Sequence, residues 1–147
     1  MSSSVSNSSI VEDKITNEIR VLIANSGLFN QKIADQLHIT PSDLQVLHLI
    51  ALSGPMTPGS LAKATGLTTG GVTVLIDRLQ SQGFVCRKRN EKDRRSVFIH
   101  LIRDSLADVE VVYENKRTDT LNVIRAFNCD EQSIIFNFLF KLNNEVS

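Results

Sequence analysis

The sequence predicts a mainly α-helical chain that carries one two-stranded β-hairpin between its fourth and fifth helices. Over most of the chain, apolar residues recur at three- and four-residue spacing, which is the period of an amphipathic helix. The stretch from Phe84 to Leu101 instead combines β-branched and aromatic residues on both sides of a polar turn, which is typical of a hairpin. A chain of 147 residues with 41% hydrophobic content is expected to form one globular unit.

The N-terminal part is expected to be a disordered tail followed by a long helix. Six of residues 1–9 are serine, so almost nothing there can be buried, and we expect no stable structure. From Ile10 to about Leu37 the apolar residues follow helical spacing, which predicts an amphipathic helix with Gly27 as its weak point.

The next three helices are predicted from their start and stop signals. Each follows a threonine that can accept a hydrogen bond from the free amides of the first turn, and a glycine or proline ends it. The predicted helices are residues 41–53 after Thr40, 58 to about Ala64 after Thr57, and a helix after Thr68 or Thr69 that runs to about Gln82 before Gly83.

The second half of the chain completes the predicted order of elements. Strands are expected over residues 84–89 and 96–101, joined by the polar turn 90–95. Helical spacing then returns from about Asp104 to Phe127, and Asp130 opens a last helix through Leu142. The order is therefore four helices, a hairpin and two helices.

Charge is distributed unevenly although the chain is neutral overall. Residues 54–103 carry a net charge of +6, and the remainder carries −6. A basic middle region inside an acidic frame indicates one surface that meets phosphates, such as those of DNA. The alternative is an ordinary solvated loop with basic flanks.

The predicted helix after Thr68 presents two different faces. Val72, Leu75, Ile76 and Leu79 follow the core spacing of a helix. The opposite side is made of short side chains, with Arg78 at its edge: Gly70, Thr73, Val74, Asp77 and Ser81. Such a face can approach a DNA backbone closely and reach base edges, whereas a plain surface helix usually carries Lys and Glu.

The residues around this helix have the spacing of a winged helix-turn-helix. Leu61, Ala62 and Gly66 suit the first helix and its turn, and a basic hairpin follows the second helix directly. The hairpin supplies candidate phosphate contacts, and an arginine at its tip suits a narrow minor groove. Asp93 either holds the turn through backbone amides or lies near DNA. The basic residues are Arg87, Lys88, Arg89, Lys92, Arg94 and Arg95.

The segment LTTGGVTVLIDRLQSQGFVCRKRNEKDRRSVFIHL, residues 67–101, resembles the MarR family of bacterial transcriptional regulators. Their recognition helix has the pattern V-T-x-x-[VI]-D-x-L, followed by G-[LFY]-V and a wing with D-x-R. The upstream stretch ITPSDLQVLHLIALSGPMTPGSLAKATG is similar to the family's second and third helices. Two positions depart from the family pattern: Val74 replaces a frequent arginine, and residues 101–105 replace the usual L-T-x-x-G.

The resemblance implies a homodimer that binds a palindromic site in double-stranded DNA. Residues 10–39 and 104–147 would form a helical dimerisation region, and residues 40–103 the winged helix-turn-helix domain. The implied function is a repressor released by a small aromatic ligand. The predicted DNA-binding residues, from the resemblance and the residue pattern together, are Thr68, Thr69, Gly70, Thr73, Arg78, Lys92, Arg94 and Arg95.

Other function classes find no support in the sequence. No catalytic motif occurs, so we expect no enzyme and no cofactor. Cys86 and Cys129 are expected to be small packed thiols, with a redox switch as the alternative, and the three histidines lack metal-ligand spacing. No stretch suits a signal peptide or a membrane helix, so a cytoplasmic protein is expected.

The number of phenylalanines near the C-terminus is larger than the surface of a monomer is expected to expose. This favours their burial in a dimer. The alternative to a DNA-binding regulator is a winged-helix adaptor that binds proteins and has lost DNA readout. The small residues of the predicted recognition face and the arginines of the wing favour the regulator.

Overall fold

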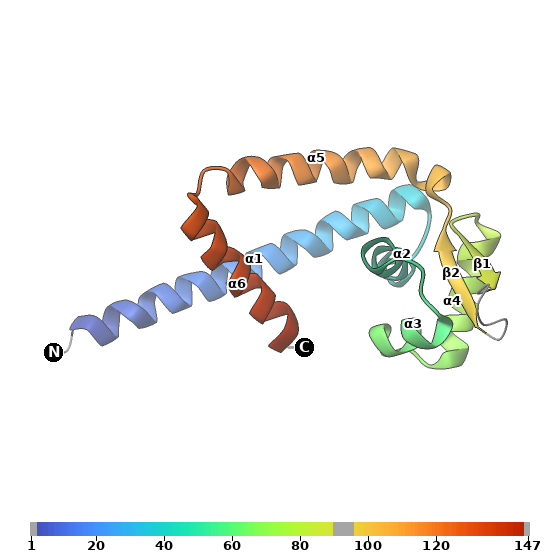
Figure 1. Ribbon diagram of the computed structural model, residues 1–147, viewed down its shortest axis with the longest axis horizontal. Coiled ribbons are helices and arrows are strands. Elements are labelled where there is room, and N and C mark those ends of the chain that lie inside the picture. The colour runs from blue at the N-terminus through green and yellow to red at the C-terminus, as the bar shows by residue number, and fades with distance from the viewer. Residues whose placement is uncertain (1–2, 90–95, 146–147) are drawn as a thin grey trace. The chain divides into compact units, whose positions relative to one another are not determined.

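The computed structural model describes residues 3–89 and 96–145, in which four α-helices precede one antiparallel hairpin and two α-helices follow it along the chain (Figure 1). The predicted mainly α fold with a two-stranded wing is confirmed. The elements are α1 (Ser3–Leu37), α2 (Pro41–Ser53), α3 (Pro58–Thr65), α4 (Thr69–Ser81), β1 (Val85–Arg89), β2 (Val97–Leu101), a short 3-10 helix (Arg103–Leu106), α5 (Ala107–Ile124) and α6 (Cys129–Glu145).

The expected disordered tail is wrong for residues 3–9, because α1 already begins at Ser3. Extending an existing helix adds one backbone hydrogen bond for each residue fixed, so the apolar sequence after Ile10 can support the serines before it. The Ser8 hydroxyl also donates to the Glu12 carboxylate at 2.9 Å. Gly27 does not interrupt α1, which runs as one helix in Figure 1.

The hairpin is held in register and anchored to the helices. β1 and β2 pair from Val85 opposite Leu101 to Arg89 opposite Val97. On the other edge of β2, the amide of Ile99 donates to the carbonyl of Met56 at 2.8 Å, and the amide of Met56 donates back at 3.2 Å. The glycine and proline before Thr57 predict only the end of a helix, and no sequence signal indicates that Met56 adds this second pairing to β2.

The core of residues 1–105 lies between α2, α3, α4 and the hairpin. Leu61 of α3, Ile76 and Leu79 of α4, and Ile99 of β2 are completely buried. Figure 1 shows these elements grouped at the C-terminal end of α1, which packs on α2. The core therefore fixes α4 through one face and leaves its other face exposed.

Contacts divide the chain into two units, residues 1–105 and 106–147. The second unit consists of α5 and α6, joined by a short turn, and α6 buries none of its residues. The fifth helix begins at Ala107, after the 3-10 helix, rather than near Asp104. In the described ranges 3–89 and 96–145, no helix is both long and apolar enough to cross a membrane.

Candidate nucleic-acid interface

The turn between α3 and α4 places the start of α4 at the surface. Gly66 ends α3 in the left-handed conformation, with φ of 70°, which glycine adopts without strain. Two residues later, the Thr68 hydroxyl oxygen accepts a hydrogen bond from the Gly71 amide at 3.1 Å and caps α4. This is the short helix, tight turn and second helix expected of a helix-turn-helix.

The exposed face of α4 is lined by small side chains, as the sequence predicts. Val72, Leu75, Ile76 and Leu79 are buried, whereas the side chain of Val74 is 62% exposed. A Cβ atom added at Gly70 would meet no atom within 4 Å. The packing of the free chain therefore does not require glycine at position 70, and the missing side chain leaves room for a partner to approach.

The hydroxyl groups on this helix keep bonding capacity for a partner. Because the Thr68 oxygen accepts from the Gly71 amide, its proton remains available to a phosphate oxygen. Thr73 instead donates its proton to the Thr69 carbonyl at 2.9 Å, so its oxygen lone pairs and methyl group remain. Thr69 and Gly70 are exposed beside them.

The wing is tied to α4 by Arg87. One terminal nitrogen of this side chain on β1 donates to the Gln80 side-chain oxygen at 2.6 Å, and the other donates to the Asp77 carboxylate at 2.6 Å. Arg87 thus joins hairpin and helix, while Lys88 and Arg89 are exposed farther along β1. The predicted contacts Lys92, Arg94 and Arg95, with Asp93, lie outside the described residues.

Arg78 is bound to a carboxylate that the sequence analysis did not select as part of the site. Its Nε and Nη2 atoms donate to the two oxygens of Asp43 at 3.1 and 2.5 Å. Asp43 is completely buried at the start of α2, where it also accepts a hydrogen bond from the Thr40 amide. A signal was present: Asp43, Leu47 and Ile50 share one face of α2 at helical spacing, so the carboxylate lies on the buried stripe.

The charge of Asp43 is stabilised in the folded chain. Burial raises the pKa of this carboxyl, but the hydrogen bonds from Arg78 and from the Thr40 amide outweigh it and hold the pKa below its ordinary value. Asp43 therefore pairs with Arg78 as an anion, in addition to closing the capping box of α2 with Thr40.

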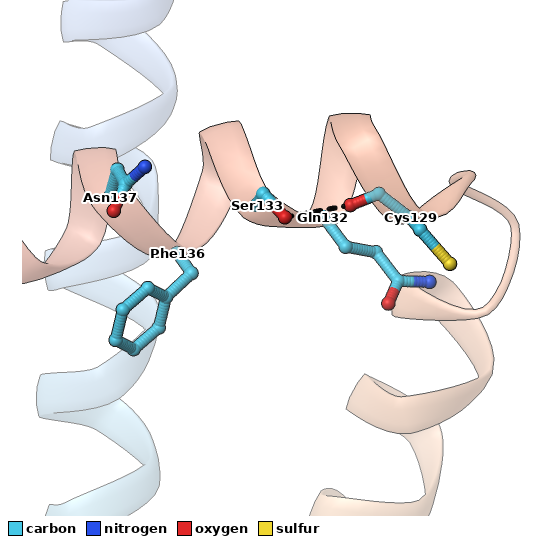
Figure 2. A pocket seen from close by; sticks show the side chains of 5 residues that line it. All are labelled: Cys129, Gln132, Ser133, Phe136 and Asn137. Carbon is cyan, nitrogen blue, oxygen red and sulfur yellow. Dashed lines mark hydrogen bonds between the residues drawn. The ribbon is translucent and has the colours of Figure 1, made fainter.

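A separate hollow of about 540 Å³ lies on the first half of α6. Figure 2 shows the side chains that line it, with the Ser133 hydroxyl donating to the Cys129 carbonyl. One helix alone contributes the lining, so the hollow is open rather than enclosed. Within residues 3–89 and 96–145, no cluster of three His, Cys, Asp or Glu side chains suits a metal ion. The lining residues are Cys129, Gln132, Ser133, Phe136 and Asn137.

Comparisons with known proteins agree with this geometry. The MarR family model matches residues 38–96, which run from the end of α1 into the wing. An uncharacterised HTH-type transcriptional regulator of Bacillus subtilis, YcgE, is 36% identical over 122 residues, which are 83% of this chain and 79% of the relative.

Solved structures share the fold over nearly the whole chain. A MarR family protein from Bacillus stearothermophilus is 27% identical with a TM-score of 0.68, covering 94% of this chain and 96% of its own. Streptococcus pneumoniae FabT, solved in complex with DNA, is 19% identical with a TM-score of 0.68, covering 92% and 96%. By its sequence relatives and its winged-helix fold, the chain belongs to the MarR family of DNA-binding transcriptional regulators.

Proposed function

We propose that this protein is a homodimeric repressor that reads a near-palindromic operator with the exposed face of α4. The observation that carries the proposal is the capped N-terminus of α4, where short side chains replace the long charged ones of an ordinary surface helix. FabT was solved with DNA bound, which supports DNA as the partner of this fold.

The proposed contacts come from two elements with different tasks. At the start of α4, the hydroxyl and methyl groups of Thr69 and Thr73 read base edges in the major groove. Gly70 lets the helix approach closely, and the Thr68 hydroxyl donates to a phosphate oxygen. Lys92, Arg94 and Arg95 of the wing contact phosphates and the minor groove, where guanidinium groups gain from the groove's negative potential. Arg78 is not included in this set, because its guanidinium is bound to Asp43.

The proposed dimer is supported by the apolar side chains that the single chain leaves exposed. Phe136 and Phe140 of α6 are 65% and 57% exposed, and Leu22 of α1 is 61% exposed. A second copy of the chain can cover these side chains and bring two α4 helices to one DNA face. The operator half-sites are then about 10 base pairs apart, one turn of the duplex.

A small aromatic acid is the proposed effector that releases DNA. The support for this effector is the resemblance to ligand-responsive family members. The hollow on α6 adds none, because it is open and does not enclose a ligand. A screen of phenolic acids by thermal shift and DNA release tests this part. Release by thiol oxidation alone, with no active acid, would replace the ligand with a redox signal at Cys86 or Cys129.

The DNA-reading proposal is tested first by selecting genomic fragments with the purified protein. An operator without two-fold symmetry contradicts the dimer, and a failure to select any sequence favours a protein-binding adaptor. The selected operator and a scrambled duplex then serve for equilibrium binding at several salt concentrations.

Two variants separate the tasks of helix and wing. Arg95→Ala is expected to weaken binding to both duplexes and to lower the slope of log affinity against log salt by up to about 0.9, one phosphate contact. Thr73→Ala is expected to cost about 1–3 kcal/mol on the operator and little on the scrambled duplex.

The matched control is Thr120→Ala on α5, because Thr120 donates to the Lys116 carbonyl at 2.9 Å just as Thr73 donates to Thr69. The control should bind both duplexes like the wild type. Equal losses on both duplexes for Thr73→Ala, with Arg95→Ala unchanged, would contradict the assignment of helix and wing.

A further inference from the structure

The carboxylate of Asp43 is buried more deeply than helix capping requires. It sits at the third position of α2 and closes a capping box with Thr40. The corresponding position of α3 is Ser60, whose amide donates to the Thr57 hydroxyl at 3.1 Å and whose side chain is exposed. In α4 that position is Gly71. These two helices are capped without a buried charge, so Asp43 has a further task.

The partner of this carboxylate lies 35 residues away on α4. Arg78 meets both oxygens of Asp43, the two-point geometry that orients a guanidinium as well as attracting it. One helical turn later, the Gln82 side chain donates to the His38 carbonyl at 3.4 Å. Arg78 of α4 therefore reaches the start of α2, and Gln82, directly after α4, reaches the connection between α1 and α2.

This side of α4 is distinct from the proposed DNA-reading side. At 100° per residue, Thr73 lies about 140° and Thr69 about 180° around the helix from Arg78. Fixing Arg78 therefore fixes the rotation of α4 and, with it, the direction in which Thr69 and Thr73 point.

The core alone restrains this rotation less strongly. Val72, Leu75, Ile76 and Leu79 form an apolar stripe that can tolerate small turns, whereas hydrogen bonds weaken steeply when their angles change. Releasing Arg78 would also leave a buried carboxylate without its cation, so the bound orientation is strongly preferred.

We propose that Asp43 and Arg78 are a positioning pair, which sets the rotation of α4 so that Thr69 and Thr73 meet the bases, while Arg78 itself contributes no DNA contact. The proposal rests on DNA reading by α4. It assigns specificity to a carboxylate in α2 that no base can reach, since its side chain is completely buried.

The test compares Arg78→Gln, Arg78→Lys, Asp43→Asn and the double variant with Asp43→Asn and Arg78→Gln in the full chain. Affinity for the selected operator and for a scrambled duplex is measured at several salt concentrations, at a temperature where circular dichroism shows each variant folded. Lys88→Gln is the matched control, because Lys88 is an exposed cation of the wing strand β1.

Arg78→Gln is expected to lower operator affinity about tenfold, as for one lost base contact, with scrambled binding and the salt slope unchanged. Arg78→Lys keeps the charge but loses the two-point geometry, so an intermediate loss is expected. The double variant can restore a neutral amide-to-amide hydrogen bond and should lose less than the two single losses combined. Lys88→Gln should lower the affinity for both duplexes equally.

Two results would overturn the positioning pair. Equal losses on both duplexes with a salt slope lower by about 0.9 would make Arg78 a phosphate contact. An unchanged ratio of operator to scrambled affinity in Arg78→Gln and Arg78→Lys, with only a lower unfolding midpoint, would make the pair structural. A wild-type chain without operator preference would instead reject the proposed function, and the positioning pair would fall with it. If Asp43→Asn does not fold, the two Arg78 variants decide alone.

Discussion

The winged domain, residues 41–101, and the helix α6 use their apolar side chains in opposite ways. Leu61, Ile76 and Leu79 of the domain are completely buried by the chain itself. In α6, by contrast, Ile134 is 68% and Phe136 is 65% exposed, and no residue of the helix is buried. The domain is thus complete within one chain, whereas α6 carries a surface that a single chain leaves in water.

This difference separates two sources of stability. The domain gains its stability from contacts within the chain, so its unfolding should not depend on protein concentration. The exposed residues of α6 contribute to stability only when another surface covers them, and that contribution depends on protein concentration by mass action.

The largest effect is expected when charged side chains replace two exposed phenylalanines of α6. Phe136 and Phe140 have ring centroids 5.9 Å apart, and a dimer with both copies packed there would bury four such rings at about 1.5–3 kcal/mol each. The double variant with Phe136→Glu and Phe140→Glu should give the mass of one chain by light scattering, while Lys141→Glu on the same helix stays dimeric. A wild-type mass of one chain would remove the distinction between the two regions.

The second largest effect is expected from a substitution that makes a cavity in the core of the winged domain. Leu79→Ala should lower the free energy of unfolding by about 2–5 kcal/mol, because the removed methyl groups leave a space that the core cannot refill. Urea unfolding followed by circular dichroism should show this loss at every protein concentration. Ile134→Ala is the contrasting variant, and its loss should shrink on dilution. If both losses vary with concentration, the domain is not complete within one chain.

A smaller effect is expected where α1 meets the domain. His38 adopts the left-handed backbone conformation, with φ of 55°. This conformation carries a strain energy for residues with a Cβ atom but not for glycine. His38→Gly should therefore raise the free energy of unfolding by about 1 kcal/mol. The opposite change, Gly66→Ala at φ of 70°, should lower it. A destabilised His38→Gly variant would show that the side chain matters more than its backbone.

The smallest effect is a pH dependence inside the domain. Burial lowers the pKa of His48 on α2, so at mildly acidic pH the unfolded chain takes up a proton that the folded chain does not. Stability should therefore fall as the pH drops below about 6.5, the ordinary pKa of histidine. His48→Gln should reduce this fall. Because the cause is burial, 0.5 M salt should leave it in place, and a fall that salt abolishes would indicate surface charges.

The sequence predicted the parts of the fold that depend on local signals. Three threonine caps and the glycines after α3 and α4 marked the helices of the domain to within one or two residues, because these signals act within a single turn. The apolar stripe of α4 likewise gave its buried face. The N-terminal serines misled, since a propagating helix does not need strong helix formers at its end.

Contacts between distant residues were beyond the sequence. The spacing of Arg78 placed it at the edge of the α4 face, but only the fold shows that Asp43 binds it across 35 residues. The sequence predicted Arg87 as one of the wing's phosphate contacts, but its side chain is bound to Asp77 and Gln80. Charge patterning counts side chains and cannot say which of them already have a partner.

The pairing of Met56 with Ile99 has a consequence for how the wing tolerates changes in length. β2 is hydrogen-bonded along one edge to β1 and along the other to Met56, so its register is set at the base of the hairpin. Residues added between positions 90 and 95 are therefore expected to leave Ile99 in the core, since doubling the length of a loop costs in general only about 0.6 kcal/mol of closure entropy. The span of the wing and the stability of the domain are separate variables, which makes the hairpin a suitable place to graft a longer basic arm or a reporter peptide.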